Sequence, residues 1–487
     1  MYTAKMWIGG EWVDAVSGKT ITTVNPATEE KFATVPLAGD EDVDKAVKAA
    51  RVAFKVWSKL PPIARSGILF QMAAALRAEA EELSQIHSQE HGTPISDARF
   101  MCGVIAPGLL EYAAGASRTI MGEQIPMDPD TISYLKRDAM GVAGLIIPWN
   151  VPVLVTCAKM GPAISVGNTC VIKPPSVNSY TVLKLAEIFS KVKDLPPGVV
   201  NVITGPGGAV GNAIASHPGV DCLGFTGSSD TGKAILKAAS QTVKKCSMEL
   251  GGKNPVLVMA DADLDACVNT HTGMQFNNSG QHCSSPGRYY VHEKVYDQFI
   301  EKMIAAANRS IVGDPSDDKT TMGPMASEEH YNKVTALIKS GVAEGAKIVA
   351  GAEKPANLNK GYYIMPTVFA DATHDMRIAR EEIFGPVSVV IKFKEGDDFV
   401  QLANDSRYGL CASIWTKDVG KGMQIMNELE TGNVFINCHT LTGEQPWGSN
   451  VKDSGLGREG AVQGILDFTD LKMVTIRFGN SVPSGHH

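Results

Sequence analysis

The sequence predicts an α/β protein whose first half is built on a doubly wound parallel sheet. Between residues 141 and 260, apolar runs of strand length alternate regularly with amphipathic helical stretches. Continuous apolar strands of this kind are typical of a parallel sheet that helices bury on both faces. A second α/β pattern begins at about residue 251, and 487 residues are enough for two or three domains. We therefore expect a Rossmann-type domain followed by another α/β domain.

The expected elements follow from the pattern in chain order. Two long amphipathic helices over 40–60 and 62–91 come first. The alternating half then predicts strands near 141–148, 169–175, 197–205, 220–227 and 245–250, with helices near 157–167, 179–194, 208–218 and 229–243. In the second pattern we expect helices over 294–310 and 327–345 and strands over 386–393 and 432–437.

Composition excludes several classes of partner. The chain is 44% hydrophobic and 20% charged, its net charge is −7, and it has no basic block, so we expect no nucleic-acid partner. The most apolar stretch, 141–155, is broken by Pro148 and Pro152 and is short for a membrane span, so we expect no membrane partner. Nine scattered cysteines without a CxxC pair indicate reduced thiols and a cytoplasmic protein.

Three short motifs come close to known patterns. "GSSDTGKA" (227–234) has the GxxxxGK of a phosphate-binding loop, but Ala234 replaces the hydroxyl residue that would hold Mg²⁺, so we do not expect a nucleotide triphosphatase. Its strand-to-helix turn either presents a helix N-terminus to a pyrophosphate or is only a tight turn. "GPGGAVG" (205–211) has the wrong glycine spacing for a dinucleotide fingerprint.

The third motif, "HSQEH" (87–91), fits the HxxEH of one family of zinc peptidases. No third ligand can be identified, so we interpret this stretch as a solvated helix face and expect no metal site.

One cysteine has surroundings unlike the others. Cys283 lies in "FNNSGQHCSSPGR" (276–288), among small and polar residues, whereas Cys157, Cys170 and Cys411 lie in apolar runs. A cysteine in a loop of this kind is a candidate nucleophile, a metal ligand or merely a turn residue, and those in apolar runs are expected to be buried and inert.

Seven stretches together resemble the aldehyde dehydrogenase superfamily, in particular its NAD(P)-dependent, hydrolytic, non-CoA-acylating branch. They are "IIPWN" (146–150), "VIKPPS" (171–176), "FTGSSDTG" (225–232), "MELGGKNP" (248–255), "FNNSGQHC" (276–283), "EEIFGPV" (381–387) and "PWGSNVKDSGLGRE" (446–459). The resemblance implies an aldehyde-dehydrogenase-like fold: an NAD(P)-binding domain over 1–118 and 140–250, a catalytic domain over 251–450, and a small β extension of oligomerisation strands over 119–139 and 468–480.

The resemblance also implies a reaction in which an aldehyde is oxidised to its acid with NAD(P)⁺. Cys283 is similar to the family nucleophile, which forms a thiohemiacetal and then a thioester. Glu249 is similar to the general base that hydrolyses the thioester, and Asn150 to the amide that, with the backbone N–H of Cys283, stabilises the oxyanion. The resemblance places Lys173 among the catalytic residues as well as among the cofactor-binding residues. Adjacent side chains seldom face each other, so His282 is expected to line the pocket and not to act as a base.

Two other functions remain possible for a protein of this fold. One is a non-catalytic structural or binding member, against which the intact Cys283, Glu249 and Asn150 argue. The other is a CoA-acylating semialdehyde dehydrogenase, although such relatives tend to lack the equivalent of Glu249. A thioester hydrolase activity of the same nucleophile is a further possibility.

The cofactor-binding residues implied by the resemblance extend over both halves of the chain: Trp149, Lys173, Ser176, Gly207, Gly227, Ser228, Leu250, Glu382 and Phe384. NAD⁺ is the expected cofactor. Many NAD-preferring members carry a glutamate where this chain has Ser176, and a neutral residue there does not repel a 2′-phosphate, so NADP⁺ is an alternative.

The expected substrate pocket consists of residues that flank the proposed catalytic ones: Val151, Leu154, Val155, Ala158, Asn277, His282, Ser284, His439, Thr440, Leu441 and Trp447. Small or polar residues at several of these positions, and the absence of Lys and Arg, favour a larger neutral or aromatic aldehyde as the small-molecule partner. Residues 133–141 and 470–479 resemble the family's oligomerisation strands, so a homodimer or homotetramer is expected.

Overall fold

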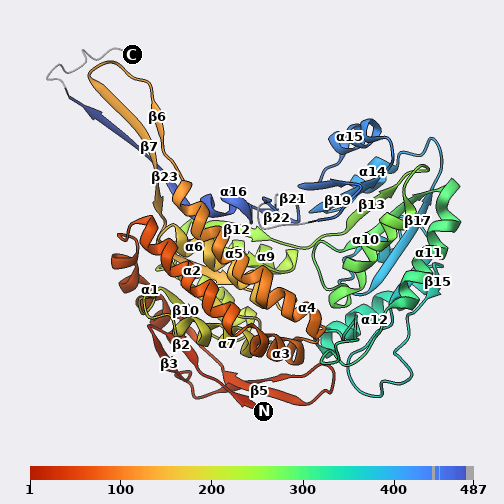
Figure 1. The fold of residues 1–487 in the computed structure, drawn as a ribbon, viewed down its shortest axis with the longest axis horizontal. Helices are drawn as coiled ribbons and strands as arrows, with labels where there is room; N and C mark the ends of the chain where they lie inside the picture. Colours follow the sequence, from red (N-terminus) through yellow and green to blue (C-terminus); the bar gives the residue numbers. More distant parts are fainter. Residues whose placement is uncertain (441–444, 449, 479–487) are drawn as a thin grey trace.

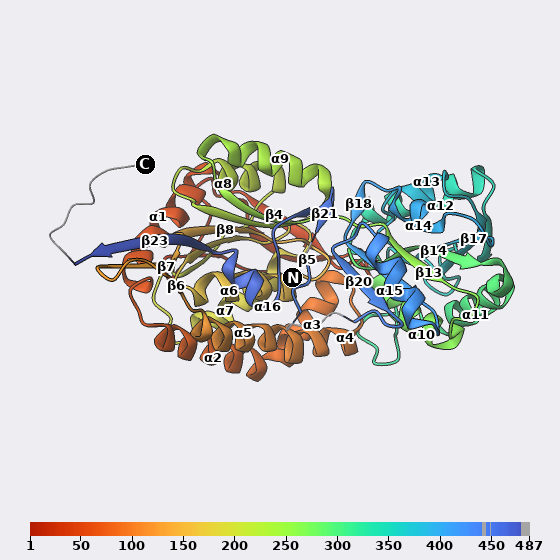
Figure 2. The same ribbon diagram turned by 90° about the horizontal axis from the view of Figure 1, so that it is seen from above.

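The computed structural model describes residues 1–440, 445–448 and 450–478. Two α/β lobes lie side by side, and a narrow arm of strands projects from the first (Figures 1 and 2). The first lobe contains the N-terminal half of the chain and the second contains most of the rest. This arrangement confirms the predicted α/β class, whereas the domain boundaries at residues 118, 140 and 250 stay a prediction.

The first lobe contains an eight-stranded sheet whose central strands are parallel. Its order is β22 (Gly455–Leu456), β12 (Lys245–Glu249), β11 (Cys222–Thr226), β8 (Val142–Ile146), β9 (Thr169–Lys173), β10 (Val200–Val202), β2 (Met6–Ile8) and β3 (Glu11–Val13). The run from β12 to β10 is parallel and corresponds to the strands expected from the sequence. The antiparallel strands at the two ends of the sheet, β22 at one edge and β2 followed by the edge strand β3 at the other, were not expected.

Helices cover both faces of this sheet, as the apolar strands predict. Alternate residues of β8 belong to different cores: Leu145 packs with one and Ile146 with the other. One face is covered by α1 (Asp40–Trp57), η3 (Gly207–Gly211), α8 (Asn212–Ser216) and α9 (Ser229–Ala239). The other is covered by α2 (Pro62–Ala78), α3 (Ala80–His91), α6 (Pro152–Ser165), α7 (Ser179–Ser190) and the helical stretch from 95 to 119.

Two features of the helical layer differ from the sequence expectation. The predicted single helix over 62–91 is broken at Glu79, whose φ/ψ of −110°/14° interrupts the helical path between α2 and α3. The stretch 95–119 was not expected at all; it comprises α4 (Ile95–Phe100), η1 (Met101–Ile105), α5 (Ala106–Ala116) and η2 (Ser117–Thr119). By length and composition alone this stretch could cross a membrane, but here it packs against α2 and α6 in the same layer.

The second lobe has its own largely parallel sheet. The order is β15 (Lys347–Ala350), β16 (Thr367–Ala372), β17 (Val387–Phe393), β14 (Pro286–His292), β13 (Asn254–Val258), β19 (Cys411–Trp415) and β20 (Asn433–Ile436), with only β15 antiparallel to its neighbour. One face packs on α10 (Leu264–Phe276), η6 (Glu293–Val295) and α11 (Tyr296–Arg309). The other packs on α12 (Glu328–Ala343), α13 (Arg377–Arg380), α14 (Phe399–Asn404) and α15 (Val419–Glu428).

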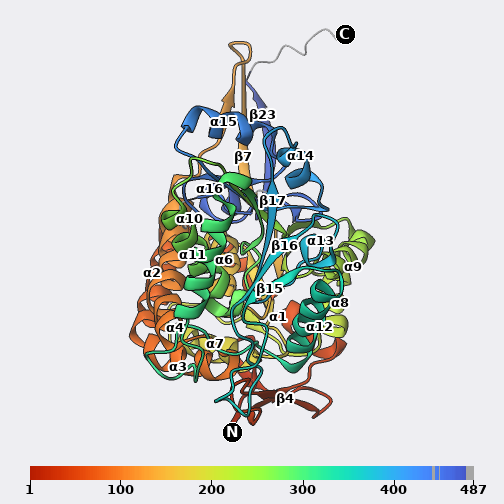
Figure 3. The same cartoon turned by 90° about the vertical axis from the view of Figure 1, so that its right-hand side faces the viewer.

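The arm is a three-stranded antiparallel sheet of β6 (Glu123–Ile125), β7 (Thr131–Ala139) and β23 (Thr469–Arg477), which stands clear of the lobes in Figure 3. Strands β7 and β23 fall within the two stretches, 119–139 and 468–480, that the resemblance implies as oligomerisation strands; residues 479 and 480 lie outside the described residues, and the role in assembly stays a prediction. Short strands complete the fold: β1 (Tyr2–Thr3), β4 (Thr20–Val24) and β5 (Lys31–Pro36) form one small sheet, and β18 (Tyr408–Gly409) pairs with β21 (Val451–Lys452). Helix α16 (Ala461–Leu466) leads into β23.

Candidate active site

The predicted site residues of the first lobe lie where its parallel strands end. Asn150 follows β8, Lys173 ends β9, Ser228 follows β11 and Glu249 ends β12. Because these strands are parallel neighbours, their carboxyl ends share one edge of the sheet, the usual ligand edge of a doubly wound fold. Residues separated by up to about a hundred positions in sequence therefore share one side of the molecule.

Cys283 lies in the loop between η5 (Asn277–Gly280) and β14, and its side chain is half-buried. Its carbonyl oxygen accepts a 2.8 Å hydrogen bond from Nδ2 of Asn254, the first residue of β13. Side chains of Leu410, Cys411 and Phe435 form a small apolar cluster against it. The thiol is therefore held at the surface of the second lobe's sheet and not inside its core, unlike Cys157, Cys170 and Cys411, which are buried as expected.

An unusual turn brings Cys283 to this position. Asn278, Ser279 and Gly280 all have left-handed backbone angles, with φ of 49°, 56° and 69°. At Gly280 a side chain would collide with the carbonyl oxygen of Gly385, so only glycine fits there. A left-handed residue other than glycine costs about 1–2 kcal/mol, so surrounding contacts must hold the turn. Ser279 contributes one by donating to the carbonyl oxygen of Gly323 at 2.7 Å.

Asn150 of the first lobe contacts this turn directly. Its Nδ2 donates to the carbonyl oxygen of Gln281 at 2.9 Å, and its own carbonyl oxygen accepts from Nδ2 of Asn278 at 3.0 Å. Asn150 is buried. An amide nitrogen carries two hydrogens, so Nδ2 of Asn150 has a second one to offer to a ligand oxygen beside Cys283.

Glu249 is buried and its carboxyl group is poorly compensated. Burial raises the pKa of Glu249 to about 7, although a hydrogen bond from Asn450 and the charge of Lys159 both lower it. Oε1 of Glu249 has no hydrogen-bond partner among the described residues. The α-carbon of Gly448 lies so close to this carboxylate that a side chain there would collide with it. Glu249 thus has the protonation behaviour of a group that exchanges protons near neutral pH.

The thiol and this carboxyl group influence each other. Burial, together with the negative charges of Glu249 and Glu382, raises the pKa of Cys283 to about 12, although the backbone N–H groups of Ser284 and Cys283 act in the opposite direction. A positive charge brought to this side of the loop would favour the thiolate. Among the described residues, Lys159 is the cation that contributes to the pKa of Glu249, and it is itself buried in an ion pair with Glu459.

Several residues expected to bind a cofactor lie at the carboxyl edge of the first sheet. Ser228 is the N-cap of α9, and its Oγ accepts from the backbone N–H of Thr231 at 3.3 Å. Gly207 is exposed and has open space where a side chain would lie. Lys173 is buried, donates from Nζ to the carbonyl oxygen of Pro174 at 2.8 Å, and has its pKa lowered to about 8 by burial. Ser176 donates to the carbonyl oxygen of Gly205 at 3.0 Å.

The remaining residues expected to bind the cofactor come from both lobes: Trp149 and Leu250 from the first, and Glu382 and Phe384 from the second. Trp149 lies beside Asn150, and its carbonyl oxygen accepts from Nδ2 of Asn178 at 2.6 Å. Leu250 is buried and follows Glu249. Glu382 accepts a 2.9 Å hydrogen bond from the backbone N–H of Gly252, and burial raises its pKa.

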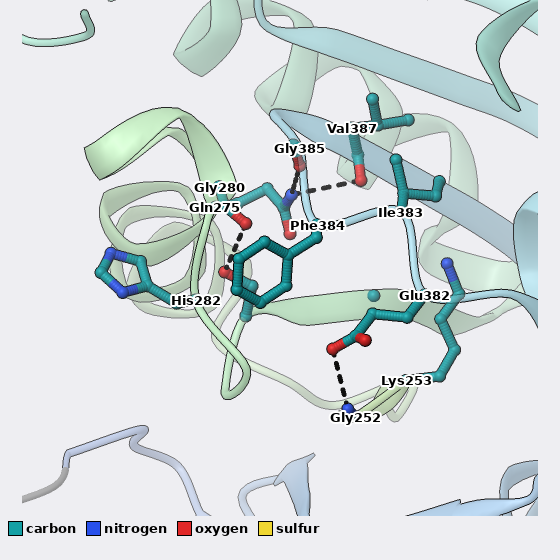
Figure 4. A pocket seen from close by; sticks show the side chains of 12 residues that line it. Gly252, Lys253, Gln275, Gly280, His282, Glu382, Ile383, Phe384, Gly385 and Val387 are labelled. Atoms are coloured by element: carbon teal, nitrogen blue, oxygen red, sulfur yellow. Dashed lines mark hydrogen bonds between the residues drawn. The ribbon is translucent and has the colours of Figure 1, made fainter. Parts of the chain in front are cut away.

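Figure 4 shows the pocket on the second lobe that Glu382 and Phe384 line together with His282. The His282 ring points away from the Glu382 carboxylate, and the Phe384 ring lies between them in this view. Burial lowers the pKa of His282 to about 4, so the ring is neutral at physiological pH. His282 is thus placed as a pocket-lining residue on the side of the cofactor candidates.

The expected substrate residues lie around the first turns of α6 and the loops beyond the second sheet. Val155, Ala158, Ser284 and His439 are buried; Val151, Leu154, Asn277, His282 and Trp447 are half-buried; and Thr440 is exposed. Leu441 lies outside the described residues. Ala158 and Trp447 line a second small pocket whose other walls are mainly apolar.

The sequence reasoning missed several residues at these pockets. Leu109 and Tyr112 reach the second pocket from α5, a helix that the sequence analysis did not predict. Lys253 and Gln275 line the first pocket. Lys253 and Asn254 were visible in the quoted "MELGGKNP" stretch, but no pattern in the sequence assigned them a contact with the loop of Cys283.

One sequence interpretation is wrong. The "HSQEH" stretch is not a solvated helix face, because His87, Glu90 and His91 are all buried at the end of α3. Glu90 accepts hydrogen bonds from the backbone N–H groups of Tyr180 and Thr181 and so caps α7. The helix is buried because the unexpected stretch 95–119 and helix α7 cover it. In the described part of the chain, no group of three or more His, Cys, Asp or Glu side chains is arranged to hold a metal ion.

Known proteins that are similar to this chain are aldehyde dehydrogenases. The family model "Aldehyde dehydrogenase family" matches residues 12–474. Aldehyde dehydrogenase 1A1 of Homo sapiens is 41% identical over 481 residues, 97% of this chain and 95% of that protein, and "Aldehyde dehydrogenase, cytosolic 1" of Elephantulus edwardii is 40% identical over 97% and 95%. The NAD⁺ complex structure of aldehyde dehydrogenase from Bacillus cereus superposes with a TM-score of 0.95 at 38% identity, covering 98% of this chain and 97% of that one. The chain therefore belongs to the aldehyde dehydrogenase family.

Proposed function

We propose that the protein oxidises an aldehyde to the free carboxylic acid with NAD⁺, using Cys283 as nucleophile and Glu249 as general base. The observation that carries this proposal is the convergence of three groups from separate elements: a half-buried thiol, the amide of Asn150 and a buried carboxyl group with a pKa of about 7. Acyl transfer through a thiol needs a nucleophile, an oxyanion donor and a base for water.

The proposed reaction assigns one task to each of these groups. The Cys283 thiolate adds to the aldehyde carbon, and the carbonyl oxygen, now negative, accepts hydrogen bonds from Nδ2 of Asn150 and the backbone N–H of Cys283. NAD⁺, when bound, accepts the hydride that leaves this carbon, and a thioester remains on Cys283. Glu249 then takes a proton from water, and the resulting attack releases the acid and the thiol.

The residues that would hold the cofactor fit a dinucleotide. The open space at Gly207 and the capped N-terminus of α9 at Ser228 suit a pyrophosphate, because the free backbone N–H groups at a helix N-terminus can donate hydrogen bonds to an anion bound there. Lys173 and Glu382 offer a donor and an acceptor for ribose hydroxyls. The Trp149 and Phe384 rings lie 5.3 Å apart at 75°, which provides an apolar wall on this side of the thiol. The aldehyde dehydrogenase of Bacillus cereus that binds NAD⁺ supports the same cofactor here.

For the substrate, we propose a larger neutral or aromatic aldehyde. The second pocket brings together Leu109, Tyr112, Ala158, Pro162 and Trp447, and its lining among the described residues contains no Lys or Arg. Ala158 on α6, which lines this pocket, is small and leaves room for a larger substrate. A carboxylate-bearing aldehyde would lack a cationic partner in this pocket. The competing CoA-acylating reaction is disfavoured because Glu249 provides a base that promotes hydrolysis of the thioester.

The arm supports an oligomer. Leu471 and Met473 on β23 are 54% and 67% exposed and point to the same face of the strand. A long strand with exposed apolar side chains is an unusual surface for a monomer. We propose that the arm pairs across subunits in a homodimer or homotetramer. A cytoplasmic location is proposed from nine free thiols and from the relative named cytosolic.

The decisive test follows NADH absorbance with a panel of neutral and aromatic aldehydes. The wild-type protein should produce NADH, and Cys283→Ala should lose at least about 10⁴-fold in kcat because no thiohemiacetal can form. Cys246→Ala, which removes a half-buried thiol from β12, should keep kcat within about twofold. Unchanged turnover in Cys283→Ala would contradict the assigned nucleophile.

A second prediction concerns Glu249 and pH. The base acts only when ionised, so kcat should rise with pH through about 7 and level off above it. Glu249→Gln should remove this rise while retaining a pre-steady-state burst of NADH, since acylation precedes hydrolysis. Rapid-mixing absorbance measures both quantities. A variant without a burst would show that Glu249 also acts before acylation.

Cofactor choice can be tested at one position. Ser176→Glu places a negative charge beside the ribose site, so kcat/KM with NADP⁺ should fall at least about tenfold while kcat/KM with NAD⁺ changes little. Ser176→Gln is the matched neutral control and should have a much smaller effect. Equal losses with NADP⁺ in the two variants would mean that side-chain size, and not charge, is responsible.

The assembly is tested by light scattering coupled to gel filtration. Wild-type protein should elute with a mass that is two or four times the 51.8 kDa of one chain. The double variant Leu471→Glu, Met473→Glu should shift toward smaller particles, because two charges on the arm oppose its burial against a partner. Val243→Glu, at a position that is 92% exposed, is the control and should leave the mass unchanged. A wild-type monomer would refute the proposal.

A further inference from the structure

The buried "HSQEH" stretch ends in a hydrogen-bond network that the proposed reaction leaves unused. At the end of α3, the imidazole rings of His87 and His91 stack with centroids 5.1 Å apart and planes 12° apart. Nδ1 of His91 lies 2.6 Å from Oγ1 of Thr93, and Nε2 of His87 lies 3.3 Å from the same oxygen. Oγ1 of Thr93 in turn lies 3.1 Å from Oδ1 of Asn278, on the loop of Cys283.

The direction of each hydrogen bond in this network follows from the number of available protons. Oδ1 of Asn278 can only accept, so the single hydroxyl proton of Thr93 is donated to it. Both histidine nitrogens must then donate to Thr93, which accepts through its two lone pairs. The opposite ring nitrogens, Nδ1 of His87 and Nε2 of His91, are consequently unprotonated in neutral rings, and neither has a hydrogen-bond partner among the described residues.

Burial agrees with this protonation. Both rings are fully buried, and burial lowers the pKa of His87 to about 4 and that of His91 well below its ordinary value. Neutral rings with one proton each are therefore the state at physiological pH, and the pattern of donors and acceptors is unambiguous.

The next bond in the network reaches the proposed oxyanion site. Since Oδ1 of Asn278 faces the Thr93 hydroxyl, its Nδ2 faces the other way and donates to the carbonyl oxygen of Asn150 at 3.0 Å. Asn278 is also the first of the three left-handed residues of the turn before Cys283. The orientation of the Asn278 amide therefore bears on two things: the backbone position of Asn150 and the conformation of the turn.

We propose that Thr93, supported by His87 and His91, is a positioning residue that fixes the amide of Asn278 and through it the oxyanion donor Asn150. The proposal rests on the function proposed above. Without the hydroxyl, Oδ1 of Asn278 would be buried without a donor, and a rotated amide would place an oxygen against the carbonyl oxygen of Asn150. The hydrogen bond that Asn150 offers to the oxyanion would then lose its alignment, which slows the chemical step more than it weakens cofactor binding.

The test replaces the hydroxyl of Thr93 by a methyl group of similar size. Thr93→Val should lower kcat about tenfold or more while KM for NAD⁺ stays within about twofold, and Thr93→Ser, which keeps the hydroxyl, should restore kcat to within about threefold of wild type. Thr181→Val is the matched control: it also removes a buried hydroxyl that bonds to α3, at Oε2 of Glu90, but it does not touch Asn278. Its kcat should stay within about twofold of wild type.

The possible outcomes separate the proposals. A kcat of Thr93→Val within about twofold of wild type, or a Thr93→Ser variant as slow as Thr93→Val, would overturn the positioning role. So would a Thr181→Val variant that loses as much activity, since the loss would then reflect general packing. If Thr93→Val does not fold, Thr93→Cys applies the same test, because a thiol is a much weaker donor. Failure of the proposed function is distinct: the wild-type protein would give no NADH, or Cys283→Ala would stay active.

Discussion

The site depends on one contact between the two lobes, the pair of hydrogen bonds between Asn150 and the turn before Cys283. Asn150 donates to the carbonyl oxygen of Gln281 and accepts from the side chain of Asn278. These bonds connect the ligand edge of the first sheet to a loop that belongs to the second sheet. The turn itself is conformationally costly, with three successive left-handed residues, so it persists only because contacts from both lobes hold it.

Burial of ionisable groups gives this region its chemical character. Glu249, Lys159 and Glu459 are withdrawn from water at the carboxyl edge of the first sheet, and Glu249 is left with an incompletely satisfied carboxyl group. Such an arrangement is costly for folding, since desolvation of a charge is only partly offset by a paired neighbour. The same desolvation raises the pKa of Glu249 into the range where a carboxyl group exchanges protons at neutral pH.

The helical layer next to the site also has a role beyond covering the sheet. Helix α3 ends against the loop of Cys283 and supplies buried imidazoles, while its Glu90 caps α7 through two backbone N–H groups. Helix α5 supplies Leu109 and Tyr112 to the apolar pocket. Residues before 120 therefore line the second pocket and contact the loop of Cys283, so the helical layer contributes to the candidate site as well as to the core.

The sequence by itself determined the α/β class, the parallel strands of the first sheet and the stretch around Cys283, because apolar periodicity and residue chemistry are local properties. It also indicated Asn150 and Glu249 through stretches that resemble a family. Tertiary structure decided what no local pattern contains: the break between α2 and α3 at Glu79, the helical stretch 95–119, and the burial of His87 and His91. From sequence alone, polar side chains on a helix are expected to be exposed to solvent, and only the packing of other segments shows that they are buried. The residues in their hydrogen-bond networks, such as Asn278, lie far away in the sequence.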